Sequence, residues 1–214
     1  MLKACIFDLD GVIVDTAKYH YLAWKRLAKN LGFTFTEQDN ERLKGVSRFD
    51  SLKILLSIGK IEKKEQEFEE LAAIKNQWYV EYVSRLTPSE ILPGTLEILD
   101  FLKKRNIPVA IGSSSRNARI ILNCIGLENA FDSIVDGTRI AKAKPDPEVF
   151  TKAADDLGVN YSECIVFEDA FTGIEAAKNA GMKAIGIGAP DILIQADMVV
   201  PSLDKLDYNK LFEL

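Results

Sequence analysis

The run Ala4-Cys5-Ile6-Phe7 leads directly into Asp8-Leu9-Asp10-Gly11-Val12 near the start of the chain. Four consecutive apolar residues are typical of a short buried strand. Asp8 and Asp10 stand two residues apart, so they point to the same face of that strand, and Gly11 would end it there. Two neighbouring like charges cost free energy unless a cation or a shared proton compensates them. The pair therefore indicates a Mg²⁺ site or an acid/base couple, although two surface carboxylates would give the same local pattern.

Short apolar runs of the same kind recur along the chain, and helical patterns closed by glycine lie between most of them. We expect further strands at 108–112, 134–135, 164–167 and 184–187. Helix stripes are expected at Leu96, Leu99 and Leu102, at Ile121, Leu122 and Ile125, and at Phe150, Ala153, Ala154 and Leu157. Helices are expected to begin at Pro147 and at a capping box formed by Thr172 and Glu175, and to end before Gly126, Gly158 and Gly181. The alternation predicts an α/β fold with a doubly wound, Rossmann-like parallel sheet.

One segment interrupts this alternation. From Thr16 to Tyr82 no convincing strand is found, but helical stripes occur around Trp24, Leu52 and Phe68. We therefore expect a catalytic core built from residues 1–15 and 83–214, with a helical cap inserted at 16–82. Such an insert leaves the sheet at its carboxyl edge, where open α/β folds bind ligands. It either covers the site as a lid or extends the core.

Composition limits the classes of partner. The chain has 214 residues, 27 basic and 32 acidic side chains, and a net charge of −5. A chain of this length fits one substantial core and a smaller appendage, at roughly 150 residues per domain. Without a basic field, neither nucleic acid nor an anionic membrane is an expected partner. Three cysteines without C-x-x-C spacing, and no apolar leader, indicate a reducing, cytoplasmic location. We also expect a monomer.

Polar groups follow other expected strands as well. The second strand runs out into Ser113-Ser114-Ser115-Arg116-Asn117, whose hydroxyls and backbone N–H groups would either hold phosphate or simply cap a helix. Lys144 precedes Pro145 in a stiff turn, where it would neutralise phosphate or an aspartate, or be solvated. The fourth strand ends in Glu168-Asp169, which suit oxygen ligation of Mg²⁺. All these groups fall at the carboxyl ends of strands in one sheet, which strengthens the functional interpretation.

In this order and spacing, the motifs resemble those of the haloacid dehalogenase-like superfamily of phosphotransferases over essentially the whole chain. The resemblance implies that Asp8 is a nucleophile that forms an aspartyl-phosphate and that Asp10 is the general acid/base. It implies that Ser113 and Lys144 hold the phosphoryl group. It also implies that Mg²⁺ is held by Asp8, the Asp10 carbonyl and Asp169, with Glu168 beside them.

The helical insert resembles the cap of the phosphosugar mutases within that superfamily. The segment Asp15-Thr16-Ala17-Lys18-Tyr19-His20 resembles the start of that cap. By the same resemblance His20 would bond to Asp10. The remaining residues that the resemblance places at the substrate are Thr16, Lys44, Gly45, Val46, Ser47, Arg48, Ser51, Ser115, Arg116 and Asn117. Arg116 stands where these proteins often have lysine, and it would grip a distal phosphate with bidentate geometry.

The resemblance implies a Mg²⁺-dependent mutase that interconverts β-glucose 1-phosphate and glucose 6-phosphate, with glucose 1,6-bisphosphate as activator and intermediate. A sugar-phosphate phosphatase of the same fold shares every core residue, and only the Lys44 to Arg48 loop favours the mutase. A nucleotide-binding module without catalysis is disfavoured, because no G-x-G-x-x-G follows a strand and Gly186-x-Gly188 lacks the third glycine.

Overall fold

The computed structural model describes residues 1–43 and 46–214, and within them the chain divides into two compact units. The core unit consists of Met1–Asp15 and Thr87–Leu214, and the helical unit of Thr16–Leu86. The sequence places the end of the insert at Tyr82, inside the last turn of helix α4 (Glu65–Val83). The helical unit continues to Leu86, and the N–H groups of Arg85 and Leu86 donate to the last carbonyls of α4.

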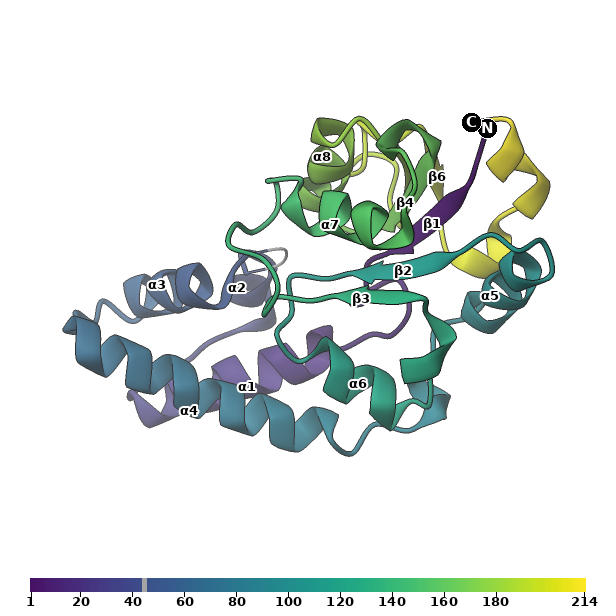
Figure 1. Cartoon of the computed structure of the whole chain (residues 1–214). Coiled ribbons are helices and arrows are strands. Elements are labelled where there is room, and N and C mark those ends of the chain that lie inside the picture. The colour runs from purple at the N-terminus through teal and green to yellow at the C-terminus, as the bar shows by residue number, and fades with distance from the viewer. Residues whose placement is uncertain (44–45) are drawn as a thin grey trace. The chain divides into compact units, whose positions relative to one another are not determined.

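A parallel sheet forms the centre of the core unit (Figure 1). In the described part of the chain it has six strands in the order β3-β2-β1-β4-β5-β6. Their bounds are β1 Ala4–Phe7, β2 Val109–Gly112, β3 Ser133–Val135, β4 Cys164–Glu168, β5 Lys183–Ile187 and β6 Met198–Val200. This order confirms the doubly wound α/β fold, and the direction of winding reverses between β1 and β4. Ligands bind at that switch point in open α/β sheets, outside the carboxyl ends of the strands.

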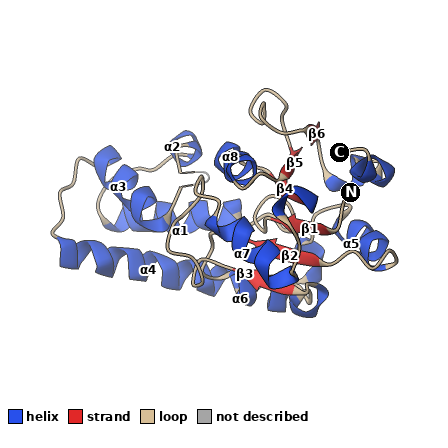
Figure 2. Ribbon diagram, turned by 45° about the horizontal axis from the view of Figure 1, so that its top comes forward, coloured by secondary structure: helices blue, strands red, loops and turns tan. Residues whose placement is uncertain are grey.

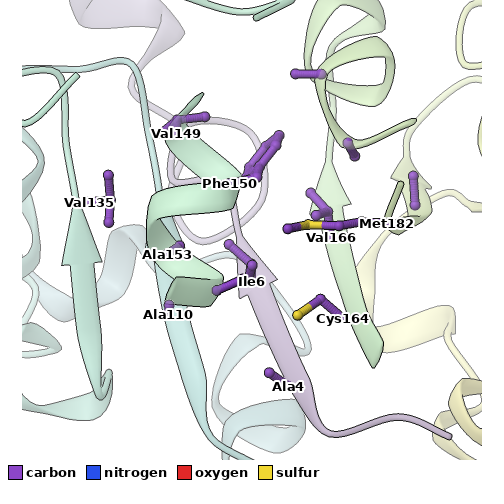
Figure 3. Close-up of a cluster of buried hydrophobic side chains, with 14 of the residues drawn as sticks. Ala4, Ile6, Ala110, Val135, Val149, Phe150, Ala153, Cys164, Val166 and Met182 are labelled. Carbon is purple, nitrogen blue, oxygen red and sulfur yellow. The ribbon is translucent and has the colours of Figure 1, made fainter. Parts of the chain in front are cut away.

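Helices cover both faces of the sheet. Helices α7 (Glu148–Leu157) and α8 (Phe171–Asn179) lie on one face, and α5 (Thr95–Lys103) and α6 (Ala118–Cys124) on the other (Figure 1). Alternate strand residues such as Ile6, Ala110 and Val166 point toward α7 and α8. There they form a buried hydrophobic cluster that includes Phe150 (Figure 3). Because both faces are buried, the strands read as continuous apolar runs.

The helical unit contains α1 (Ala17–Asn30), α2 (Glu37–Glu41), α3 (Arg48–Ile58) and α4, and Figure 2 shows no strand among its described residues. Its own apolar cluster includes Trp24, Leu27, Leu52, Leu55 and Ala72, so this unit has a core of its own. Short 3₁₀ turns complete the described structure at Pro88–Glu90, Glu128–Ala130, Tyr161–Glu163, Leu203–Lys205 and Tyr208–Phe212. No helix in the described part is both long and apolar enough to cross a bilayer.

Three local features differ from the sequence prediction. Strand β6 is not predicted; it lies at the edge of the sheet and its three residues are only partly buried. Leu96 is 53% exposed rather than core-facing, since α5 buries Ile98, Leu99 and Leu102 instead. Helix α8 begins at Phe171, so Thr172 lies inside the first turn and forms no capping box. Glu168 caps the start of α8 instead, because its Oε1 accepts from the N–H of Ala170 at 3.1 Å.

Candidate active site

The carboxyl ends of β1 and β4 bring together acidic residues that lie far apart in the sequence. Phe7 pairs with Phe167 in the parallel ladder, and the N–H of Asp8 donates to the carbonyl of Phe167 at 2.9 Å. Carboxylate oxygens of Asp8, Glu168 and Asp169 all lie within 4.8 Å of one another, the one cluster of its kind among the residues described. The structure therefore brings both acidic motifs to the switch point of the sheet.

Lys144 lies between two of these carboxylates. Its Nζ is 2.5 Å from Oδ1 of Asp8 and 2.7 Å from Oε2 of Glu168, and its side chain is only 7% exposed. The solvated alternative for this lysine is therefore wrong. Glu148, at the start of α7, shapes the preceding loop by accepting from the N–H groups of Ala141 and Lys142 at 2.9 and 2.8 Å.

The described side chains of this site include more carboxylates than ammonium groups. Burial raises the pKa of Asp8 to about 8, against the lowering effect of Lys144, and Glu168 and Asp10 raise it further. Burial and the same acidic neighbours raise the pKa of Asp169 to about 9. Burial disfavours the charged form of Lys144, but the two carboxylates outweigh it and raise the pKa of this ammonium. One ammonium cannot neutralise the carboxylates of Asp8, Asp10, Glu168 and Asp169. These oxygen donors therefore fit a divalent cation that prefers oxygen ligands.

Two glycines make room for the acidic groups. Gly11 has a φ of +82°, which favours glycine, and a Cβ there would lie 2.1 Å from Oδ2 of Asp169. A Cβ on Gly173 would lie 2.0 Å from the carboxyl carbon of Glu168. Both positions therefore require glycine because the carboxylates occupy the space of a side chain.

The serine loop after β2, residues 113–117, presents hydroxyls at the same edge of the sheet. The N–H of Ser113 continues the ladder by donating to the carbonyl of Val135 at 3.0 Å. Its Oγ accepts from the N–H of Ser115 at 3.1 Å, and Oγ of Ser115 accepts from the N–H of Asn117 at 3.2 Å. Each hydroxyl uses a lone pair in these bonds and keeps its O–H to donate, which suits an anionic ligand.

In the helical unit, several sequence-predicted residues have local structural partners. Thr16 is buried, and its hydroxyl accepts from the Tyr79 hydroxyl at 3.1 Å. Ser47 caps α3 by accepting from the N–H of Asp50, and the hydroxyl of buried Ser51 donates to the carbonyl of Val46. Arg48 is half-buried at the start of α3. Lys44 and Gly45 lie outside the described residues.

His20 is held by residues of α4. Its Nδ1 lies 2.9 Å from Nζ of Lys75, and its ring stacks on Tyr79 with centroids 4.0 Å apart. An ammonium has only protons to donate, so Nδ1 must accept and Nε2 carries the ring proton. Burial, then the charges of Lys75 and Arg48, lower the pKa of His20 well below its usual range. The ring is therefore neutral and offers one N–H donor, while its bond to Asp10 stays a prediction.

Lys75 is a residue that the sequence reasoning does not single out, although it is 2% exposed and its ammonium lies 4.3 Å from the centroid of the Trp24 ring. The sequence nevertheless contains a signal for this buried lysine. The buried face of α4 includes Ala72, Tyr79 and Val83, and Lys75 occupies the position of that stripe where an apolar residue is expected. A lysine in the apolar stripe of a helix indicates a buried cation with an aromatic or polar partner.

Most of this chain matches a family of known proteins. The sequence model of the haloacid dehalogenase-like hydrolases matches residues 2–181, a range that includes every strand-end group described above. The chain belongs to the haloacid dehalogenase-like hydrolase family. Membership in this family makes the protein an enzyme and agrees with the parallel sheet and its acidic switch point.

Two relatives of this chain are named for different activities. A β-phosphoglucomutase of Bacillus subtilis is 46% identical over 99% of this chain and 95% of its own length. A phosphorylated carbohydrates phosphatase of Thermotoga maritima is 34% identical over 86% of this chain and 84% of its own. The crystal structure of a β-phosphoglucomutase from Clostridium difficile superposes with a TM-score of 0.94 and 40% identity, covering 100% of this chain and 96% of that one.

Proposed function

We propose that this enzyme is a phosphosugar mutase that interconverts β-glucose 1-phosphate and glucose 6-phosphate. The observation that carries phosphoryl transfer in this proposal is the Asp8, Lys144, Glu168 and Asp169 cluster at the switch point of the sheet. The 46% identical relative named for this activity supports the choice of substrate. The similarity covers the helical unit as well as the core, since it extends over 99% of the chain.

In the proposed mechanism Asp8 attacks the phosphorus of the bisphosphate and forms an aspartyl-phosphate, which divides one difficult transfer into two easier ones. Asp10 protonates the departing sugar oxygen and then takes the proton from the accepting hydroxyl of the next sugar phosphate. Glucose 1,6-bisphosphate is thus both the intermediate and the activator. Each half-reaction uses both aspartates, so loss of either one stops the cycle.

The metal in this proposal is Mg²⁺, and Asp8, Asp169 and the Asp10 carbonyl would hold it, with Glu168 beside them. These are hard oxygen donors, which Mg²⁺ prefers. When bound, the ion neutralises charge on the phosphoryl oxygens. Lys144 and the hydroxyls of the serine loop neutralise the remaining charge and fix the orientation, which is most of what a loose phosphoryl-transfer transition state needs.

The helical unit is proposed as a cap that reads the phosphate that is not being transferred. Arg48 and Ser47 at the start of α3, together with Lys44, Gly45, Val46 and Ser51, would form the cap side of that recognition. Arg116 and Asn117 would form the core side. Closure that depends on sugar phosphate would keep water from the aspartyl-phosphate until the acceptor is bound.

A phosphatase is the second candidate, because the 34% identical relative is a phosphatase and the two activities use the same core groups. One assay separates them. The enzyme is supplied with β-glucose 1-phosphate, Mg²⁺ and catalytic bisphosphate, and glucose 6-phosphate and free phosphate are both quantified. We expect glucose 6-phosphate to form in large excess and excess chelator to stop it until Mg²⁺ is restored. Free phosphate as the main product would establish the phosphatase instead, and full turnover in chelator would remove the metal from the mechanism.

Arg48→Ala tests the cap. We expect kcat/KM of the mutase to fall at least about tenfold, equivalent to roughly 1.4 kcal/mol of transition-state stabilisation, because a charged contact to the distal phosphate is lost. Hydrolysis of the aspartyl-phosphate should change far less. Arg85→Ala is the matched control, since Arg85 is an exposed arginine of the same unit that pairs with Glu81 at 3.2 Å. Parallel losses in mutase and hydrolysis rates, or no loss in either, would contradict gating by phosphate recognition.

A further inference from the structure

A turn after β3 contacts the serine loop, and none of the motifs discussed above includes it. The turn is Asp136-Gly137-Thr138. Asp136 is 3% exposed, and its Oδ1 accepts from the N–H of Thr138 at 2.9 Å and from the Thr138 hydroxyl at 2.5 Å. A buried carboxylate with two donors from the same residue fixes the path of the backbone through Gly137.

This turn supports the serine loop along its length. At the near end of the loop, the N–H of Ser113 donates to the carbonyl of Val135 at 3.0 Å. Two residues further along each chain segment, the N–H of Gly137 donates to the carbonyl of Ser115 at 3.1 Å. The loop is therefore attached to β3 and its turn at two points, one on each side of Ser114.

The serine loop leaves no room for a side chain at Gly137. A Cβ there would lie 2.3 Å from the carbonyl oxygen of Ser114, and 2.9 and 3.1 Å from Cγ and N of Arg116. The φ of Gly137 is outside the left-handed region, so its conformation suits any residue. Only the close approach of the loop requires glycine. The obstacle is backbone, which cannot swing aside like the end of a long side chain.

We infer that Gly137 is a positioning residue that sets the reach of Arg116, and thereby tunes recognition of the distal phosphate. The inference rests on the proposed function, because it takes the distal phosphate as the ligand of Arg116. Ordinary van der Waals contact for a Cβ begins near 3.4 Å, so an alanine would displace the loop by about 1 Å. A misplacement of about that size in a positioning group costs up to about a hundredfold in rate.

The test is Gly137→Ala, assayed with two phosphoryl substrates. With β-glucose 1-phosphate and catalytic bisphosphate we expect kcat/KM to fall at least about tenfold, mainly through KM. Acetyl phosphate has no distal phosphate, so its hydrolysis should stay within about twofold, because Ser113 is still held by Val135. Equal losses with both substrates would mean a general collapse of the site and would overturn the inference, as would an unchanged mutase reaction.

A double-mutant cycle with Arg116→Ala separates positioning from stability. Once Arg116 is removed, Gly137→Ala should lower kcat/KM by less than about twofold, because the two changes act through one group. Full additivity would overturn the inference. If Arg116→Ala alone has no effect, the proposed distal clamp fails and the inference fails with it. If Arg116→Ala is harmful but Gly137→Ala is not, only the inference fails.

Gly158→Ala is the matched control. Gly158 follows α7 with a φ of +66°, and apart from its neighbours along the chain nothing lies within 4 Å of where a Cβ would stand. An alanine there is strained by its backbone, so it should lower the melting temperature. It should leave kcat/KM for both substrates unchanged. Loss of mutase activity in this variant, in step with its loss of stability, would show that stability alone explains the effect of Gly137→Ala.

Discussion

Asp8→Asn is expected to lower mutase turnover at least about ten-thousandfold, the scale on which the loss of a covalent nucleophile acts. The amide keeps the shape of the side chain and its carbonyl oxygen still accepts from Lys144. It cannot form an acyl phosphate, because the amide oxygen is a far weaker nucleophile than a carboxylate. The fold should therefore survive while the chemistry stops.

Two measurements check this expectation. Wild-type enzyme quenched in acid during turnover should carry one phosphoryl group that hydroxylamine removes, and Asp8→Asn should carry none. Asp100→Asn is the control, since Asp100 is an exposed aspartate of α5 that pairs with Lys104 at the surface. Retention of more than a few per cent of activity in Asp8→Asn, or a phosphoryl group on the quenched variant that hydroxylamine removes, would show that the nucleophile lies elsewhere.

The core of the site is predictable from the sequence because parallel sheets place strand ends together. Asp8 and Asp169 are separated by most of the chain, yet each follows an apolar run, and the carboxyl ends of β1 and β4 meet at one edge of the sheet. Apolar runs that are buried on both faces are the clearest local signal in an α/β protein. The fold class follows from the same alternation of strand and helix.

What the sequence does not predict depends on contacts between segments. Lys75 reads as one more charged residue until α4 is packed on α1, where its ammonium meets His20 and Trp24. Gly137 reads as an ordinary turn residue until the serine loop comes within 3.1 Å of it. Thr172 and Glu175 form a sound capping box by composition, but Glu168 serves the start of α8 from outside the helix. Tertiary contacts outweigh the local pattern at Lys75 and Gly137, whereas at α8 a neighbouring carboxylate replaces the expected cap.

Lys144→Met should separate metal affinity from turnover. The ammonium lies 2.5 Å from Asp8, an expected metal ligand, and 2.7 Å from Glu168 beside the metal site, so it competes with a cation for these carboxylates. Removing this positive charge should tighten Mg²⁺ binding about tenfold or more, because two like unit charges about 4 Å apart repel by about 4 kcal/mol near a protein surface. Turnover should still fall at least about a thousandfold, since the transferring phosphoryl group loses its fixed ammonium.

The two effects have opposite signs, and a merely damaged site cannot produce both. Calorimetric titration with Mg²⁺ gives the first effect and the mutase assay gives the second. Lys205→Met is the matched control, because Lys205 is an exposed lysine of the same unit that pairs with Asp204 at 2.8 Å. Weaker Mg²⁺ binding in Lys144→Met would mean that the ammonium organises the carboxylates for the metal. Stronger binding with unimpaired turnover would mean that it neutralises the carboxylates only and takes no part in transfer.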